Sequence, residues 1–288
     1  MRVFVVGAGG FIGGALVRYL HAHGKIVGGS SHELSRLELL MGILERSVEI
    51  RFGQSVKPEN FEGFDAVIHC AYNADPSAEE SNVDSTRLIY KAALSAGVSF
   101  QLFISSHSAR PDAASQYGIQ KYRLECFFLE RGQVVVRPGL VVGPGGLFAR
   151  NRKSILRSPF FVLPSVDQVP VYYVALEDLL KAIKQILEKR LTGAFNLFCE
   201  PPVSLRDFIR AVSRSEGREV PMISIPIDPV FRVIDLLRWM RIPLSEVITR
   251  LGVLRQNMRA PIYVSDLSKF VTEQTMIDDA VKKEKYIV

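Results

Sequence analysis

The stretch RVFVVGAGGFIGGALVRYLHAHG, residues 2–24, decides the fold class. Residues 2–6 are mostly apolar and β-branched, which predicts a short buried strand, and three glycines follow at a GxxGxxG spacing before a predicted helix. Glycines let the backbone turn sharply and approach a phosphate, and the free N–H groups of the helix N-terminus attract its charge. Because this loop follows the first strand directly, we expect it to bind the pyrophosphate of a dinucleotide rather than to be an ordinary strand–helix turn. The residues expected to contact it are Gly7, Gly10, Phe11, Ile12 and Gly13.

Strand and helix signals continue to alternate after this first unit. Buried strands are predicted up to residue 31, at 66–70 and from 100 to 106, and a helix that stops at Gly97 lies between the last two. This alternation indicates an α/β fold, a Rossmann-type doubly wound parallel sheet, in which ligands bind beyond the carboxyl ends of the strands. We therefore expect Ala71, Ser105, Pro138 and Gly139 to lie beside the cofactor.

The chain is predicted to form two lobes. Residues 1–200 form the dinucleotide-binding domain, with an excursion into the second lobe near 146–170. Residues 201–288 form a small, mostly helical substrate-binding lobe. The lobes are expected to be intimately joined, because 171–200 are predicted to return to the sheet.

The composition excludes several classes of protein. An apolar fraction of 48% indicates a globular chain with a sizeable core. The net charge of +6, without a Lys/Arg-rich tract that carries aromatic residues, predicts anionic small molecules rather than nucleic acid. Cys70, Cys126 and Cys199 are scattered without a CxxC, and His69 has no partner at ligand spacing, so we expect a reducing compartment and no metal site. With no leader and no apolar run of ~18 residues, a cytoplasmic protein is expected.

The end of the second predicted strand bears on the choice of cofactor. NAD-binding proteins usually carry an acidic residue there for the adenosine ribose. This chain has Ser30 and Ser31 instead, followed by His32 and Arg36. A ribose 2′-phosphate could lie against Arg36, which favours NADP over NAD. The alternative is that Arg36 is a solvated residue of a surface helix.

Six segments of the first half follow one another in a recognisable order. They are GAGGFIG (7–13), DAVIHCA (65–71), NVDST (82–86), ISS (104–106), YGIQK (117–121) and RPGLVVGPGG (137–146). Together they resemble the extended short-chain dehydrogenases/reductases, the NAD-dependent epimerase/dehydratase family, over roughly residues 2–212. The resemblance implies an enzyme that transfers a hydride between a substrate carbon and an NAD(P) cofactor.

The resemblance also implies roles for a Tyr–Lys pair. Tyr117 would be the general acid/base on a substrate oxygen, and Lys121 would bind the nicotinamide ribose and lower the pKa of the tyrosine. A tyrosine with an ordinary pKa of ~10 needs such help at neutral pH, and the i, i+4 spacing places both groups on one helix face. Ser106 would hydrogen-bond the same oxygen, with His107 and Ser108 as rivals for that role. Asn82 falls on the family's asparagine near the site.

Two functions share this machinery and remain open on the sequence. A nucleotide-sugar epimerase keeps its cofactor bound, whereas a ketone reductase acting on a non-sugar or lipid-linked substrate exchanges it. The absent acid and the short segment 107–116 between Ser106 and Tyr117 favour the reductase, and the frequency of functions in the family favours the epimerase. Dehydration is not expected, because no acidic pair follows Ser106. A dinucleotide-binding scaffold or sensor without turnover is the third alternative.

The last third of the chain suggests further contacts. Arg150 and Arg152 follow the Pro/Gly loop and are candidates for binding a substrate diphosphate; the alternative is a solvated loop. The segment 230–260 combines an apolar helix with several arginines, which fits either a packed substrate lobe or a peripheral contact with an anionic membrane. The family resemblance also makes a homodimer an open expectation.

Overall fold

Seven parallel strands form the central sheet, in the order β11-β6-β5-β4-β1-β2-β3. The structure, a computed structural model, describes residues 1–75, 79–164, 169–226, 229, 232 and 263–283. The strands of the sheet are β1 (Arg2–Val6), β2 (Ile26–Ser31), β3 (Leu44–Glu49), β4 (Ala66–His69), β5 (Phe100–Ile104), β6 (Val134–Pro138) and β11 (Gly193–Leu197). This is the doubly wound sheet that the alternation of strands and helices predicts.

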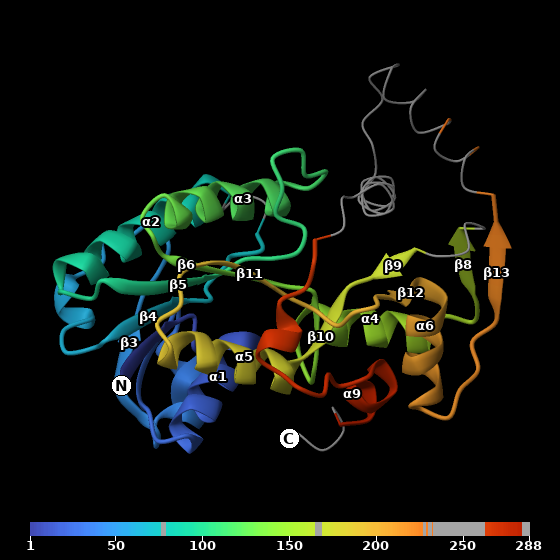
Figure 1. Cartoon of the computed structure of the whole chain (residues 1–288), viewed down its shortest axis with the longest axis horizontal. Helices are drawn as coiled ribbons and strands as arrows, with labels where there is room; N and C mark the ends of the chain where they lie inside the picture. The colour runs from blue at the N-terminus through green and yellow to red at the C-terminus, as the bar shows by residue number, and fades with distance from the viewer. Residues whose placement is uncertain (76–78, 165–168, 227–228, 230–231, 233–262, 284–288) are drawn as a thin grey trace.

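Helices cover both faces of this sheet (Figure 1). The helices α2 (Glu79–Ser95) and α3 (Gln116–Leu129) lie side by side on one face, and α1 (Phe11–Ala22) and α5 (Leu176–Glu188) lie on the other. The strands can be apolar on both faces because each face is covered, and β1 and β4 are almost entirely buried. The chain reverses direction across the sheet between β1 and β4, and such a switch point is where open α/β sheets bind ligands.

Short elements connect the sheet to the rest of the chain. A parallel pair joins β7 (Leu140–Val142) to β10 (Tyr173–Ala175), and an antiparallel pair joins β9 (Pro170–Val171) to β12 (Val203–Ser204). The 3₁₀ turns are η1 (Leu34–Leu40), η2 (Pro58–Asn60) and η4 (Leu267–Lys269).

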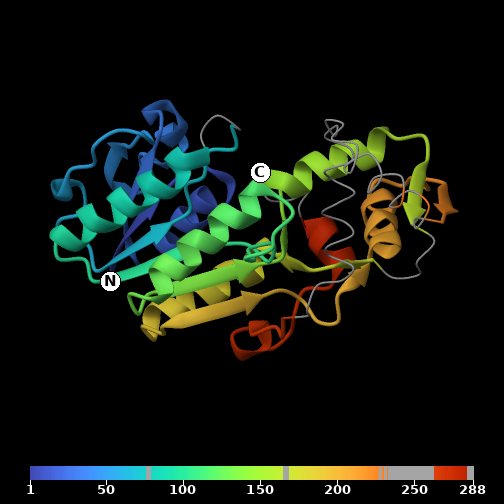
Figure 2. The ribbon, with the colours of Figure 1, turned by 90° about the horizontal axis from the view of Figure 1, so that it is seen from above.

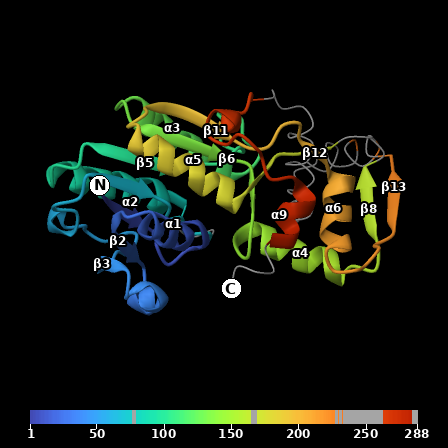
Figure 3. The ribbon, with the colours of Figure 1, turned by 60° about the horizontal axis from the view of Figure 1, so that its bottom comes forward.

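A second group of elements lies beyond one end of the sheet (Figures 2 and 3). It contains α4 (Gly146–Arg157), α6 (Leu205–Arg214), α9 (Ile277–Lys283) and the parallel pair β8 (Phe161–Pro164) and β13 (Met222–Ile225). The helix α6 packs against α4 and α9, with Phe148 edge-on to Phe208. Residues 146–164 thus leave the sheet for this group, while Asp266 returns to the sheet edge and hydrogen-bonds the backbone of Asn196 in β11.

In the described part of the chain, no helix is both long and apolar enough to cross a bilayer. The expected membrane contact through 230–260 lies outside the described residues, apart from Arg232.

Candidate active site

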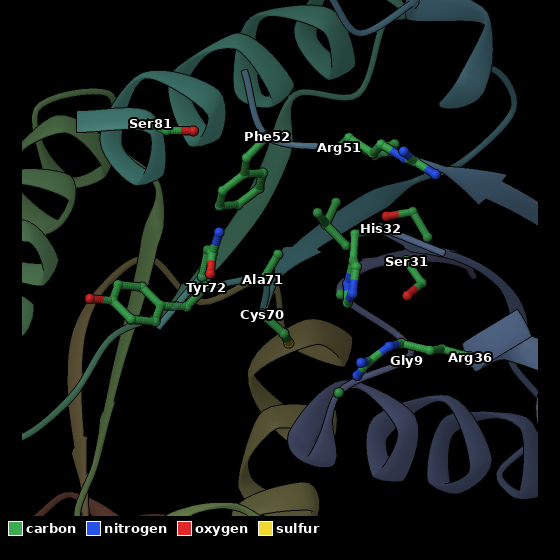
Figure 4. A pocket seen from close by; sticks show the side chains of 16 residues that line it. Gly9, Ser31, His32, Arg36, Arg51, Phe52, Cys70, Ala71, Tyr72 and Ser81 are labelled. Atoms are coloured by element: carbon green, nitrogen blue, oxygen red, sulfur yellow. The ribbon is translucent and has the colours of Figure 1, made fainter. Parts of the chain in front are cut away.

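A cavity of about 440 Å³ opens at the carboxyl ends of β1, β2 and β4 (Figure 4). Three of the segments expected at the cofactor line this cavity: the glycine loop, the end of β2 and the residue after β4. Its lining includes Gly7, Gly10, Ser30, Ser31, Arg36 and Ala71 of the predicted residues, together with Gly9, His32, Arg51, Phe52, Cys70, Tyr72 and Asn73.

The glycine loop has a backbone that side chains would not permit. Gly7 has a φ of +87°, a conformation that L side chains rarely adopt, and a Cβ there would lie 2.7 Å from the backbone nitrogen of Ala71. A Cβ on Gly13 would lie 2.2 Å from the carbonyl oxygen of Gly7, so α1 could not start so close to β1. The loop therefore presents bare backbone and the N-terminus of α1 to the cavity, as pyrophosphate binding requires.

Phe11 also packs against the Pro/Gly loop, a contact that its position in the glycine loop did not indicate. Its ring fills the space that side chains at Gly143, Gly145 and Gly146 would occupy, and a Cβ on Gly145 would lie 2.6 Å from it. The ring therefore fixes the glycine loop against the Pro/Gly loop that opens α4.

Ser30 bears on whether a dinucleotide fits this cavity. Its hydroxyl is buried, lines the cavity and has no hydrogen-bond partner among the described residues. A buried hydroxyl without a partner costs free energy, and a ligand hydroxyl at this wall would satisfy it. Together with the glycine loop, this makes the cavity a good fit for an adenine dinucleotide.

Three basic side chains line the end of the cavity away from Tyr72: His32, Arg36 and Arg51 (Figure 4). We call these three residues the basic rim. Arg36 lies in the 3₁₀ turn η1, 3.5 Å from Glu33, and Arg51 lies 3.0 Å from Glu49. Both arginine side chains are about half exposed, and no carboxylate is among the described residues that line the cavity. Arg51 was not expected from the sequence, because β3 pairs with β2 only in the folded sheet.

The opposite end of the site is built on α3. Ser115 caps this helix by accepting a hydrogen bond from the backbone N–H of Gly118 at 3.2 Å. A Cβ on Gly118 would lie 2.6 Å from the carbonyl oxygen of Ser108, so the glycine lets the first turn of α3 approach the loop after β5. This close approach places Tyr117 beside Ser106.

The side chains of Tyr117 and Ser106 lie next to each other. Burial raises the pKa of Tyr117 to about 12, whereas the sequence led us to expect that Lys121 lowers it; Ser106 opposes the rise and Tyr72 adds to it. The Ser106 hydroxyl also lies 2.9 Å from that of Ser108, so Ser108 belongs to the same network. Tyr117 nevertheless keeps 37% of its surface exposed, which leaves it accessible to a substrate.

Lys121 lies one turn after Tyr117, on the same face of α3, and is 4% exposed. Its ammonium donates a hydrogen bond of 2.8 Å to the carbonyl of Ile104 and lies 5.8 Å from the centre of the Tyr117 ring. Burial lowers the pKa of Lys121 to about 8, while Cys70 and Glu125 oppose this fall. An ammonium carries three N–H donors, so two more can serve a ligand.

Glu125 continues this face of α3 and was missed by the sequence analysis. It is buried, accepts hydrogen bonds from Arg137 Nε and Nη2 at 2.9 and 2.7 Å, and accepts another from the Ser105 hydroxyl. Ser105, expected at the cofactor, therefore uses its hydroxyl to bind α3. The i, i+4 spacing from Lys121 to Glu125 was the available signal.

Tyr72 was also missed, because it stands just beyond a predicted strand without a motif of its own. Its ring meets that of Tyr117 edge-on, with the ring centres 4.9 Å apart, and its hydroxyl donates to Gln120 at 3.2 Å. Gln120 also accepts a bond from Asn82, whose amide exchanges hydrogen bonds of 2.8 and 2.9 Å with the backbone of Asn73. In the structure the Asn82 side chain thus ties the loop after β4 to α3.

Pro138 and Gly139 lie at the end of β6, next to the loop that carries Ser106. The Pro138 carbonyl accepts a hydrogen bond from the backbone N–H of His107 at 2.9 Å. A Cβ on Gly139 would lie 2.6 Å from the carbonyl oxygen of Tyr172, so only glycine fits there. The backbone of this turn therefore sets the position of the loop that carries Ser106.

His107 points into a group of aromatic rings. Its ring centre lies 4.2 Å from that of Tyr172, 5.1 Å from that of Phe198 and 5.6 Å from that of Tyr263. Burial, together with the charges of Arg110 and Arg137, lowers the pKa of His107 to about 4. At neutral pH it is therefore an uncharged side chain, suited to a packing or hydrogen-bonding role beside a substrate.

The two arginines expected to bind a diphosphate lie on α4. Arg150 is exposed, whereas Arg152 is partly buried and forms an ion pair with Glu216, just beyond α6. Arg152 thus links α4 to the segment that follows α6. Among the described residues, no cluster of His, Cys, Asp or Glu could hold a metal ion.

Comparison with known proteins places the geometry in context. The sequence model of the NAD dependent epimerase/dehydratase family matches residues 3–197. No curated protein matches the sequence.

Many solved structures share the fold. The crystal structure of gox2253 has a TM-score of 0.76 at 21% identity, covering 99% of this chain and 97% of that one. MoeE5 in complex with UDP-glucose and NAD has a TM-score of 0.65 at 22% identity, covering 79% and 86%. The UDP-glucose 4-epimerase of Thermotoga maritima, solved with UDP-glucose, has a TM-score of 0.69 at 17% identity, covering 99% and 98%. At these identities the similarity establishes the fold.

Proposed function

The chain belongs to the NAD dependent epimerase/dehydratase family, a family of enzymes, and from this premise we propose that it transfers a hydride at a carbinol or carbonyl carbon, with Tyr117 as the acid/base. The observation that carries the proposal is the arrangement of Tyr117 next to Ser106 and one turn before Lys121 on α3, beside the dinucleotide cavity.

The residues that would hold the cofactor follow from the cavity. The backbone of Gly7, Gly10 and Gly13 and the N-terminus of α1 would bind the pyrophosphate, and Ser30 and Ser31 would face the adenosine ribose. Lys121 would offer its remaining N–H donors to the nicotinamide ribose. When bound, the nicotinamide ring supplies the acceptor, and in the return step the donor, of a hydride.

The chain's own residues would handle the proton. In the oxidative direction, Tyr117 Oη accepts the proton of the substrate hydroxyl while the carbon loses its hydride. In the reductive direction, Tyr117 Oη returns a proton to the carbonyl oxygen. Ser106 Oγ holds that oxygen by a hydrogen bond. The Lys121 ammonium, 5.8 Å from the centre of the Tyr117 ring, would stabilise the phenolate form of Tyr117 against the burial that raises its pKa.

We favour a nucleotide sugar as the substrate. Structural neighbours of this fold are solved with UDP-glucose, and an epimerase-type reaction needs no residue beyond Tyr117, Lys121 and Ser106 for the proton. The exposed Arg150 on α4 is the arginine that would remain accessible to a substrate diphosphate, since Arg152 is paired with Glu216.

A specific observation favours an NADPH-dependent ketone reductase as the second candidate. The basic rim carries Arg36 and Arg51, and no carboxylate is among the described lining residues of the cavity, so a 2′-phosphate meets positive charge. Glu33 and Glu49 lie behind these arginines and weaken, without cancelling, that attraction. For this second candidate, NADP is accordingly the favoured cofactor.

One experiment separates the two candidates. Freshly purified protein is denatured, any released dinucleotide is identified by mass and absorbance, and a second sample is titrated with NADPH and NADH. Retained NAD, with interconversion of UDP-glucose and its 4-epimer, is expected for the epimerase. Protein without dinucleotide that binds NADPH more tightly than NADH is expected for the reductase. Failure to bind either dinucleotide would overturn both.

We also propose a cytoplasmic homodimer. The dimer is supported by two exposed apolar side chains of α2, Leu88 at 46% and Leu94 at 49%. The reducing compartment is supported by the three cysteines, which are all free. Light scattering after size-exclusion chromatography tests the dimer, and a monomer at micromolar concentration would contradict it.

A further inference from the structure

The ammonium of Lys121 is surrounded by aromatic rings. Its nitrogen lies 4.7 Å from the centre of the Phe103 ring, 5.3 Å from that of Tyr72 and 5.8 Å from that of Tyr117. A cation within about 6 Å of an aromatic face is attracted by the quadrupole of the ring, and the attraction strengthens when water is excluded. Lys121 is 4% exposed, so this condition is met.

Tyr72 is fixed in place from α3. Its hydroxyl donates to Gln120 at 3.2 Å, and its ring stands at 89° to that of Tyr117. It also lines the dinucleotide cavity, on the side away from Arg36 and Arg51 (Figure 4). One side chain therefore contacts the proposed acid/base, the proposed ribose-binding lysine and the cavity.

We propose that Tyr72 is a positioning residue for the Tyr117–Lys121 pair. Its ring helps to keep the Lys121 amine charged, and its edge-on contact holds the Tyr117 ring in place beside that amine. This inference rests on the proposed function, which assigns Tyr117 and Lys121 their roles.

The other groups that face Lys121 show why the rings matter. The Cys70 thiol, at the end of β4, has a pKa that burial raises to about 12, so it is uncharged at neutral pH. The Glu125 carboxylate, on α3, is engaged by Arg137 through two hydrogen bonds. Burial lowers the pKa of Lys121 to about 8 in spite of both groups. The ammonium is therefore stabilised by the Ile104 carbonyl and by the faces of the Phe103 and Tyr72 rings, and of these two rings Tyr72 is the one that also contacts Tyr117.

The test measures the protonation of Lys121 directly. Protein labelled with ¹³C at lysine Cε is titrated by NMR, and the Lys121 resonance is assigned by its loss in Lys121→Met. In Tyr72→Leu, which keeps apolar bulk but lacks the ring, we expect the titration midpoint to fall by roughly half to one pH unit. In Tyr72→Phe, which keeps the ring but loses the hydroxyl with its bond to Gln120, we expect less than half of that change.

A matched control comes from Tyr90 on α2. It is buried and packs edge-on against Phe127 and Phe128, so Tyr90→Leu makes the same change away from the site. This variant should leave the Lys121 midpoint unchanged. If Tyr72→Leu leaves the midpoint unchanged or raises it, the proposal is wrong, whatever the fate of the proposed function.

Turnover supplies the second readout. The alkaline limb of the kcat profile should move to lower pH in Tyr72→Leu together with the NMR midpoint, and kcat at pH 8.5 should fall several-fold. A protein that shows the NMR change but turns over no nucleotide sugar or ketone would keep the proposal for Tyr72 and overturn the proposed function. If Tyr72→Leu lowers the melting temperature but leaves the pH profile of kcat unchanged, Tyr72 only packs against its neighbours and the proposal is wrong.

Discussion

The two ends of the site hold charge in opposite ways. At the basic rim, the side chains of Arg36 and Arg51 are 54% and 52% exposed, and each pairs with a carboxylate in water. At the end built on α3, Lys121 is 4% exposed, and Glu125, one turn further along the helix, is 1% exposed. Water screens the first pair of charges, whereas the second pair must be stabilised by the protein. The charges of the rim are therefore open to solvent and to a ligand, whereas the charges on α3 are held by their protein neighbours.

The largest effect expected is on catalysis at the buried end. Tyr117→Phe removes the hydroxyl that would exchange the proton. Because general acid/base catalysis contributes about 10²–10⁴-fold, kcat should fall by at least about 10²-fold. The dissociation constant for the dinucleotide should change less than about threefold, because Tyr117 is not among the described residues that line the cavity. Steady-state kinetics and calorimetric titration measure the two quantities. Retained turnover would overturn the role of Tyr117.

The next effect concerns the stability of the two kinds of ion pair. Arg137→Leu leaves the buried Glu125 carboxylate without its partner, and the free energy of unfolding should fall by about 3–5 kcal/mol. The matched change Arg51→Leu breaks the exposed pair with Glu49 and should cost less than about 1 kcal/mol. Urea denaturation at pH 7 measures both. Equal losses would contradict the comparison between the two ends.

A smaller effect is expected on the pH dependence of stability. His69 is buried beside Gln101, and burial lowers its pKa to about 4 from an ordinary 6.5. The unfolded chain therefore takes up this proton between pH 6.5 and 4 while the folded chain does not, so the folded state loses stability as the pH falls through that range. From pH 7 to 5 the loss from this one group is about 2 kcal/mol.

Substitution separates this contribution from others. In His69→Gln the decline from pH 7 to 5 should be smaller than in the wild type by about that amount, even if the variant is less stable at pH 7. His32→Gln, at the exposed rim, should keep the full decline. Urea denaturation at both pH values measures it, and identical declines in all three proteins would refute the prediction for His69.

The smallest effect expected is on the choice of cofactor. Arg36→Leu should weaken NADPH binding by about tenfold, because it removes one screened, charge-assisted contact to a 2′-phosphate. NADH binding should change little. Calorimetric titration with both dinucleotides at 0.15 M salt checks this. If Arg36→Leu weakens the binding of NADPH and NADH equally, the basic rim does not bind the 2′-phosphate.

Much of the fold followed from local sequence patterns. Buried strands, glycine turns and helix stops depend on neighbours in the chain, so β1, β4, α1 and the Tyr117 helix lie where the sequence predicted them. The confirmed family membership rests on the same motifs. The individual roles of Tyr117, Lys121 and Ser106 remain predictions, although the structure brings Tyr117 and Ser106 into contact.

Other features needed the folded chain. Arg51 reaches the cavity because β3 pairs with β2, and Ser105 gives its hydroxyl to Glu125 rather than to the cavity. Arg152 was expected at a diphosphate and is paired with Glu216, far along the sequence. None of these partners can be read from spacing, because each contact joins separate elements.

The sequence by itself determined the strand–glycine–helix unit and the helix that presents Tyr117 and Lys121 on one face, because backbone conformation and i, i+4 spacing are local properties. Only the tertiary structure decided what surrounds the Lys121 amine. Phe103, Tyr72 and Glu125 come to it from a strand, a loop and a helix. The ionisation of a buried group depends on its neighbours in space, and these are fixed only when the elements pack together.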